Sequence, residues 1–224
     1  AWSLAERGEF AEGAAIGEEA VRIAESGGHP YSQVQAGFGL GMVYAIQGRT
    51  ELAIPALEQG WVVARLEKIP FLVPFLTGPL GAVYARAGEL DHAVTMLEQT
   101  VEQAVTMRLV ANHALRLVWL GEAYLLAGRP ASALDVARRA LQTAEERHET
   151  GQRAYAHRLL GDIAASANES DAAQAAYREA MALAEALAMR PLVAHAHHGL
   201  GTLAYRTGRP DEAKASLAVA ATMY

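Results

Sequence analysis

The residues best suited to chemistry in this sequence are histidines near its C-terminal end. His195 and His198 are three residues apart, so on a helix their imidazoles share one face, and imidazole is a common zinc ligand. Asp162 is the only plausible nearby carboxylate, and the chain has no cysteine to complete a ligand set. Histidines that line a surface or groove are much commoner than such ligand pairs. The sequence therefore favours groove histidines, with no metal and no cofactor.

A second group of polar side chains surrounds these histidines in the repeat pattern. Tyr155, Arg158, Asp162 and His198 would offer hydrogen-bond donors and acceptors to a small ligand. The spacing of Ser, His and Asp residues indicates no catalytic triad. The glycines of residues 37–41 lack the preceding strand that a phosphate-binding loop requires. We therefore expect no catalytic residue and no enzyme activity in this segment. A small-ligand sensor stays open as one alternative function.

Composition excludes several classes of protein. The chain has 224 residues, 52% of them hydrophobic, which is enough for a core. Its 19 Lys and Arg against 25 Asp and Glu give a formal net charge of −6, which argues against a nucleic-acid partner. Residues 69–85 are a long uncharged stretch, but they contain prolines and fall short of the ~20 apolar residues of a membrane span. No leader is visible, so we expect a cytoplasmic protein with no membrane partner.

The elements that must position these side chains follow a forty-residue repeat. A glycine recurs at this spacing, and Asn168, which tolerates a left-handed turn, fills the one missing place. A small residue lies five positions after each of these turn residues, and a Leu-Gly pair precedes each of them from Gly48 onward. Such regularity indicates an array of repeated units. The turn glycines are Gly8, Gly48, Gly88, Gly128 and Gly208, and the Leu-Gly pairs are 40–41, 80–81, 120–121, 160–161 and 200–201.

Each period predicts two helices, because apolar and small residues recur at steps of three and four on either side of the turn glycine. No segment shows sustained strand alternation. The predicted first helices span 31–47, 71–87, 111–127, 151–167 and 191–207, and the second helices span 10–26, 50–67, 90–107, 130–148, 170–188 and 210–224.

Helix pairs of this kind cannot bury their apolar faces alone, so they must stack. The glycine of each Leu-Gly pair would leave room for the alanine of the second helix. We therefore predict an all-α fold, a right-handed superhelical solenoid of antiparallel helix pairs. It forms a single repeat domain, with units at about 1–30, 31–70, 71–110, 111–150, 151–190 and 191–224.

The repeat resembles the tetratricopeptide repeat. The usual unit has about 34 residues, and here each helix is nearly a turn longer. The resemblance implies a protein-interaction fold whose first helices line a concave groove. The slot of Tyr84 holds Ala164 and Ala204 in later units, so packing must differ there. The residues that carry the pattern are Leu80-Gly81, Tyr84, Gly88, Ala93 and Leu97, and again Leu120-Gly121, Tyr124, Gly128 and Ala133.

In that fold, groove positions fall six and three residues before the Leu-Gly glycine and one after it. A peptide, a helix or an adjacent domain would bind there, with its apolar end toward the second unit. Packing against neighbouring helices is the alternative for each apolar side chain. Chaperone-binding relatives clamp a carboxylate with lysine at these slots, and lysine is absent here, so that partner is not expected. The predicted groove residues are Gln35, Phe38, Met42, Phe75, Leu115, Val118, Glu122, Tyr155, Arg158, Asp162, His195 and His198.

An uncharged, proline-rich segment is a second candidate surface. Pro74 and Pro79 fall within a predicted first helix, which should therefore start late or bend. Its apolar side chains would either contact a partner or a second copy of the chain, or be buried between helices. A self-associating structural module is therefore another alternative function. The patch residues are Phe71, Leu72, Phe75 and Leu76.

The C-terminal stretch resembles a narrower class. Residues 190–195, 199–201, 206–208 and 221–224 are similar to the tetratricopeptide region of bacterial proteins that join a class III adenylate or guanylate cyclase domain to an AAA-type ATPase. The resemblance implies a regulatory scaffold of a bacterial signalling protein, whose groove biases the state of attached domains. No Gly-x4-Gly-Lys-Ser/Thr loop occurs, so no catalytic residue is carried over. Both ends look cut, and we expect a piece of a longer protein.

Overall fold

The structure, a computed structural model, describes residues 1–223 and contains only helices there. Every predicted first and second helix is confirmed, with ends that differ by a few residues; Tyr224, the last residue of the last predicted helix, lies outside the described residues. The first helices are α1 (Trp2–Glu6), α3 (Pro30–Ile46), α5 (Val73–Arg86), α7 (His113–Leu126), α9 (Thr150–Ser166) and α11 (Arg190–Arg206). The second helices are α2 (Phe10–Gly27), α4 (Thr50–Leu66), α6 (Leu90–Thr106), α8 (Pro130–Glu146), α10 (Ser170–Ala186) and α12 (Pro210–Met223).

The turn inside each unit has the backbone conformation that the glycine spacing predicts. Gly48 has φ +79° and Asn168, which replaces glycine, has φ +59°. Each ends a first helix in the left-handed conformation, which glycine adopts without a Cβ penalty and asparagine tolerates. The substitution of Asn for Gly therefore preserves the repeat at this place.

The glycine of each Leu-Gly pair lets the two helices of a unit approach closely, but the partner residue differs from the prediction. A Cβ on Gly41 would lie 2.5 Å from Leu57, and one on Gly81 would lie 2.6 Å from Leu97. In these two units the leucine sixteen residues after the glycine fills the space, Tyr177 does so at Gly161, and at Gly121 the nearest atom belongs to Leu159 of the next unit. This is a correction: among the nearest atoms the predicted alanines contribute only the Ala133 carbonyl oxygen, 3.5 Å from a Cβ on Gly121, because the longer side chains reach the bare backbone of the facing helix.

The proline-rich first helix starts late, as predicted. A 3-10 turn, η1 (Pro70–Leu72), precedes α5, and Pro74 lies in the first turn of α5, where its missing N–H has no intrahelical partner anyway. Pro79 remains inside the helix. The helix therefore spans 14 residues, against 17 for α3.

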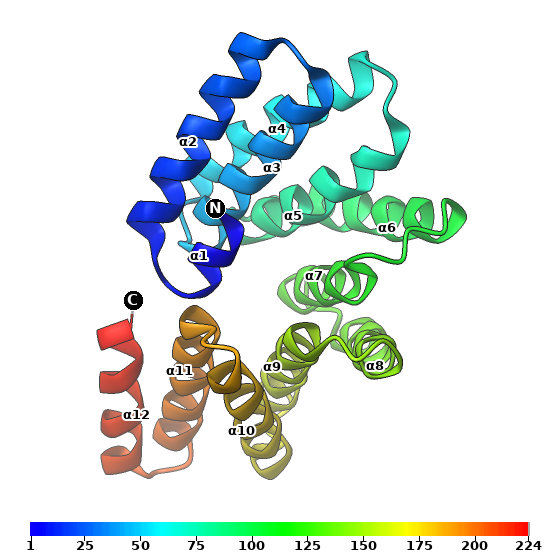
Figure 1. Ribbon diagram of the computed structural model, residues 1–224. Coiled ribbons are helices and arrows are strands. Elements are labelled where there is room, and N and C mark those ends of the chain that lie inside the picture. The colour runs from blue at the N-terminus through cyan, green and yellow to red at the C-terminus, as the bar shows by residue number, and fades with distance from the viewer. Residues whose placement is uncertain (224) are drawn as a thin grey trace.

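The units form an arc whose first helices face its inner side (Figure 1). Helices α5, α7, α9 and α11 lie toward the centre, while α6, α8, α10 and α12 lie outside. The arc curves far enough for α1 to contact α11. Side chains from the first and the last units can therefore meet across the concave face.

Among residues 1–223, every helix is either too short or too polar to cross a membrane.

Candidate functional site

A cavity of about 400 Å³ occupies the concave face. Every first helix from α1 to α11 contributes at least one side chain to its wall, so the cavity depends on the curvature of the whole arc. The lining residues include Glu6, Met42, Ala82, Arg86, Leu115, Trp119, Glu122, Leu126, Tyr155, Arg158, Asp162 and His195.

One wall of the cavity is apolar. Met42, Leu115 and Trp119 are nearly buried by their neighbours and present only a small surface to the cavity. Leu126 is the exception, because 53% of it is exposed. An exposed leucine beside a concave apolar wall is a surface that an apolar ligand group could cover.

The polar wall of the cavity is a network of charged side chains. Arg158 lies between Glu122 and Asp162 and makes a close ion pair with each of them. Arg86 approaches Glu122 from α5 at 3.3 Å, and the Tyr177 hydroxyl donates a 2.7 Å hydrogen bond to Asp162. These contacts join α5, α7, α9 and α10. The network therefore holds neighbouring units in register while it faces the cavity.

Burial and pairing act against each other on the pKa values of this network. Burial opposes ionisation of Glu122, but the guanidiniums of Arg158 and Arg86 outweigh it, so the pKa of Glu122 is lowered. Burial prevails at Asp162 and raises its pKa, although Arg158 and the Tyr177 hydroxyl work in the opposite direction. The pKa of Arg158 is raised, because its two carboxylate partners outweigh burial. Arg158 and Glu122 are therefore a charged pair at neutral pH.

A contact between the first unit and α9 lies at the edge of the cavity. The Tyr155 hydroxyl of α9 donates a 2.8 Å hydrogen bond to Glu6 of α1, and the Trp2 indole N–H donates another of 2.8 Å to the same carboxylate. Burial raises the pKa of Glu6, which these hydrogen bonds partly offset. Burial and the Glu6 carboxylate raise the pKa of Tyr155 well above its ordinary value. We call the Tyr155–Glu6 contact the clasp.

His195 faces the interior of the cavity. Its side chain is exposed there, with the guanidiniums of Arg158 and Arg86 among the other residues of the lining. Burial, reinforced by the positive charges of Arg158 and Arg86, lowers the pKa of His195 to about 4. His195 is therefore a neutral imidazole at neutral pH. Within residues 1–223, no three His, Asp or Glu side chains are grouped so that they could hold a metal ion.

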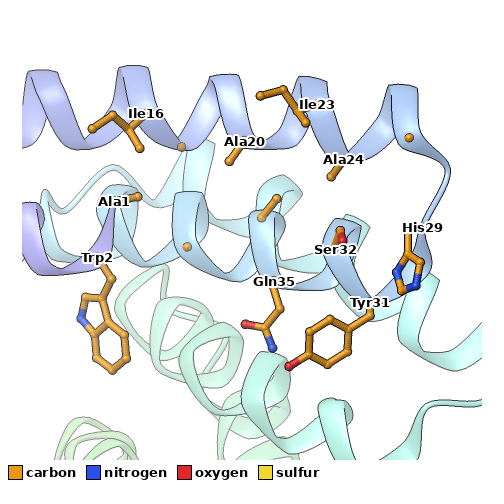
Figure 2. A pocket seen from close by; sticks show the side chains of 14 residues that line it. Ala1, Trp2, Ile16, Ala20, Ile23, Ala24, His29, Tyr31, Ser32 and Gln35 are labelled. Carbon is orange, nitrogen blue, oxygen red and sulfur yellow. The ribbon is translucent and has the colours of Figure 1, made fainter.

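Some of the predicted groove residues line the cavity, and the others lie elsewhere. Val118 is fully buried, so its predicted exposure to the groove is wrong, because a residue three positions before the glycine faces the neighbouring helices at this unit. Phe38 packs edge-on against Trp2 and Phe75, with ring centroids 5.5 Å and 6.5 Å away. His198 lines an adjoining pocket that shares Arg158, Asp162 and His195 with the cavity, and Gln35 lines a groove at the other end of the molecule (Figure 2). The predicted residues that line the cavity are Met42, Leu115, Glu122, Tyr155, Arg158, Asp162 and His195.

The predicted contact patch is not a continuous exposed surface. Leu72 and Leu76 are buried between helices, which corrects the prediction for both of them. Phe75 is half-buried, and the Arg116 guanidinium stacks 5.1 Å above its ring. Only Phe71 of the four is exposed. Leucines placed inside a solenoid seam look identical in sequence to leucines on its surface, and curvature decides between them.

Several cavity residues escaped the sequence analysis. Arg86 and Leu126 both lie five positions after a Leu-Gly glycine, and Ile46 occupies the same place in its unit. Extending the predicted groove face by one more helical turn would have found all three. Glu6 lies forty residues before Ile46 and so occupies the same repeat position, although no Leu-Gly pair precedes it, and closure of the arc then brings it to Tyr155.

Two segments, residues 80–144 and 180–224, match the family model described as Tetratricopeptide repeat. This match supports tetratricopeptide repeats in these two segments, and the rest of the described chain has the same paired-helix pattern. A comparison with curated protein sequences finds no match.

Three solved structures share the fold. BtubC (BKLC) from P. vanneervenii has a TM-score of 0.64 and 20% identity, over 96% of this chain and 89% of that one. The apo form of RapI has a TM-score of 0.77 and 14% identity, over 96% and 77%. A Rap protein complexed with the competence and sporulation factor has a TM-score of 0.70 and 14% identity, over 92% and 67%. At these identities the likeness shows the fold alone: a tetratricopeptide-like α-solenoid.

Proposed function

We propose that this chain is a protein-interaction module that binds a short, uncharged segment of a partner protein in the concave cavity. The observation that carries the proposal is the pairing of an apolar wall with a polar wall whose charges are already matched. The Rap protein of similar fold is solved with the competence and sporulation factor, which supports binding as the use of such a fold. The chain acts without catalysis.

The charge of the wall indicates what the cavity would accept. Glu122 and Asp162 are neutralised by Arg158 and Arg86, and Glu6 is already bonded to Tyr155 and Trp2. No guanidinium facing the cavity lacks a carboxylate, so an anionic ligand would have to displace an existing ion pair. An apolar side chain against Met42 or Leu126, with its peptide group toward His195, requires no such displacement.

The regulatory setting is a further part of the proposal. We propose a scaffold of a bacterial signalling protein in which occupancy of the cavity biases the attached domains. The support is the resemblance of residues 190–195 and 199–201 to the tetratricopeptide region of cyclase–ATPase proteins. The clasp supplies a contact that a bound segment would strain or reinforce, because it lies at the edge of the same cavity.

A small-ligand sensor is the second candidate. The cavity of about 400 Å³ lies within the range of small-molecule pockets, roughly 300–1,000 Å³. The clasp lies at its edge. A metabolite with an apolar body and one or two polar groups would meet both walls as well as a peptide would.

The test is selection of binding peptides from a displayed library, followed by calorimetric titration. Leu126→Asp should weaken a selected peptide at least tenfold, because it places a charge against the apolar wall. The substitution should leave the fold intact, since Leu126 is exposed. Leu66→Asp is the matched control, because Leu66 is also exposed at a helix end but lies outside the cavity. Equal affinity for both variants would exclude the cavity as the peptide site.

A thermal-shift screen of metabolites separates the two candidates. A metabolite that stabilises the wild type but not Leu126→Asp, with no peptide selected, would favour the sensor. Peptides that bind with the expected variant profile, with no stabilising metabolite, would favour the interaction module.

A further inference from the structure

A hollow of about 490 Å³ lies between the second helices α4 and α6, and it shares no lining residue with the concave cavity. Helix α4 contributes Trp61 and Arg65 to its wall, and α6 contributes Thr95, Gln99 and Gln103. The wall therefore combines an aromatic ring and a guanidinium from one helix with amides and a hydroxyl from the other. We call it the α4–α6 hollow.

The floor of the α4–α6 hollow is formed by less exposed side chains of α5 and α6. Met96, Thr77 and Thr100 are buried there, and Val73 is half-buried. The Thr100 hydroxyl donates a 2.7 Å hydrogen bond to the Thr77 hydroxyl, which donates one of 3.1 Å to the Val73 carbonyl. An apolar group laid on this floor therefore leaves no buried hydroxyl without a partner.

The same seam is almost closed one unit earlier in the chain. The residues forty positions before those of the hollow surround a space of only about 10 Å³ between α2, α3 and α4. Two glycines allow close approach there, because a Cβ on Gly37 would lie 3.5 Å from the Gly60 Cα. The Gln59 amide also donates a 2.8 Å hydrogen bond across the seam to Glu25.

Substitutions at these same repeat positions accompany the open seam between α4 and α6. Thr77 and Thr100 replace the two glycines, so side chains occupy the place where the two helix backbones approach. Arg65 replaces Glu25, and its guanidinium carbon lies over the Trp61 ring, 5.2 Å from the ring centre. The hollow is therefore particular to this seam and is not a general property of the repeat.

The charge of the α4–α6 hollow comes from one residue. Arg65 is the only Lys, Arg, Asp or Glu side chain that lines it, and among residues 1–223 this guanidinium makes no ion pair. A guanidinium that lies on an aromatic ring still presents its N–H groups at its edge, where they can form two parallel hydrogen bonds to one carboxylate. The ring of Trp61 also restricts the arginine before any ligand arrives, which lowers the entropic cost of binding.

We propose that the α4–α6 hollow binds a small organic acid, a carboxylate carried on a flat apolar body such as an aromatic ring. The carboxylate pairs with Arg65, and the ring lies on Val73 and the Met96 thioether, which favours contact with aromatic rings. Polar groups of the ligand meet the amides of Gln99 and Gln103. The volume lies within the range of small-molecule sites, roughly 300–1,000 Å³. This site is separate from the proposed function of the concave cavity.

The probe is indole-3-acetate, titrated into the isotope-labelled full chain and followed by NMR. The indole N–H signal of Trp61, assigned by its loss in Trp61→Phe, should shift saturably. The methyl ester of the probe should bind at least tenfold more weakly, because it lacks the charge. Arg65→Gln should weaken binding of the acid at least tenfold and leave binding of the ester unchanged. Arg138→Gln is the matched control, because Arg138 is also an exposed arginine of a second helix and lies outside the hollow.

Gln99→Glu provides a second test that keeps Arg65 in place. It adds a carboxylate to the opposite wall, where it can pair with Arg65 much as Gln59 bonds to Glu25 one unit earlier, so indole-3-acetate should bind at least tenfold more weakly. Leu126→Asp should leave this binding unchanged, because Leu126 lines only the concave cavity. That result would support the α4–α6 hollow whatever the outcome for the concave cavity.

Three outcomes would overturn the proposal. The first is the absence of a saturable shift of the Trp61 signal. The second is equal affinity for the acid and its methyl ester, or acid binding that Arg65→Gln leaves unchanged. The third is tighter binding of acetyl-Ala-Ala-Trp with a free terminal carboxylate than of indole-3-acetate, which would assign the hollow to the end of a partner chain.

Discussion

The Tyr155 hydroxyl donates a 2.8 Å hydrogen bond to Glu6, a residue 149 positions earlier in the chain. A solenoid whose units contact only their neighbours has no such bond. Here the arc curves until α1 meets α11, and the bond lies at the edge of the concave cavity. The geometry of the cavity therefore depends on the first unit as well as on the units that supply most of its wall.

Tyr155→Phe should open the clasp without disturbing the helices around it. A hydrogen bond to a charged group contributes about 2 kcal/mol to stability. Its loss should lower the free energy of local opening of α1 more than the free energy of global unfolding. Hydrogen exchange of the α1 amides should accelerate accordingly. Tyr205→Phe is the control, because Tyr205 is 73% exposed on α11. Unchanged α1 protection in Tyr155→Phe would show that packing alone closes the arc.

His195 should remain neutral far below the pH at which an ordinary histidine titrates. Its folded pKa is about 4, through burial and the nearby guanidiniums of Arg158 and Arg86, against about 6.5 in an unfolded chain. Between about pH 4 and pH 6.5, this histidine binds a proton in the unfolded state and not in the folded state. The contribution of His195 to the free energy of unfolding therefore falls as the pH is lowered from about 6.5 toward 4.

His195→Gln should flatten this pH dependence, because glutamine does not titrate. The variant is compared with the wild type at each pH, since the raised pKa values of Glu6 and Asp162 act in the opposite direction in both proteins. An NMR titration of the His195 imidazole gives the direct measurement. A midpoint near the ordinary histidine value would contradict the lowering of the His195 pKa by burial and the guanidiniums of Arg158 and Arg86.

Two glycines with opposite surroundings test the close approach of the helices. A Cβ on Gly81 would lie 2.6 Å from Leu97, whereas a Cβ on Gly27 meets nothing within 4 Å. Overpacking costs about 1–3 kcal/mol, which exceeds the helix propensity that alanine gains, up to about 1 kcal/mol. Urea denaturation should therefore show Gly81→Ala less stable and Gly27→Ala equally or more stable than the wild type. Stabilisation by Gly81→Ala would mean that Leu97 can move away.

Local features of the fold could be predicted because each depends on residues near it in sequence. The turn at Asn168, the late start of α5 after Pro70 and the spacing of the helix pairs follow from backbone preferences and the forty-residue pattern. The polar wall could be predicted in part for the same reason. Tyr155, Arg158 and Asp162 share one face of one helix, and the repeat register places that face inward.

The curvature of the arc could not be predicted, because it is the sum of small rotations between units. Those rotations depend on fine packing such as Trp119 against Gly78, where an added Cβ would lie 2.8 Å from the indole. Curvature in turn decides that Val118 is buried, that Leu72 is covered and that Glu6 reaches Tyr155. Side chains of the same type and register thus have different environments in different units.

Replacing Ala188, which lies in a turn between two units, should stabilise the protein. Residues 28, 68, 108, 148 and 188 all have positive φ, but only Gly28 is a glycine; Ala188 has φ +55°. A Cβ in the left-handed conformation costs about 1–2 kcal/mol, and alanine has no side-chain hydrogen bond to offset it. The Met189 N–H still bonds to the Ala184 carbonyl at 2.9 Å, so the turn itself is well formed. Ala188→Gly should therefore raise the free energy of unfolding by up to about 1 kcal/mol, after the greater freedom of glycine in the unfolded chain is subtracted.

Gly48→Ala is the converse control and should lower the free energy of unfolding by about 1 kcal/mol, since Gly48 has φ +79° and open space around its Cα. Urea denaturation at one pH measures both, and a loss of stability in Ala188→Gly would mean that unfolded-state entropy outweighs the strain at this turn.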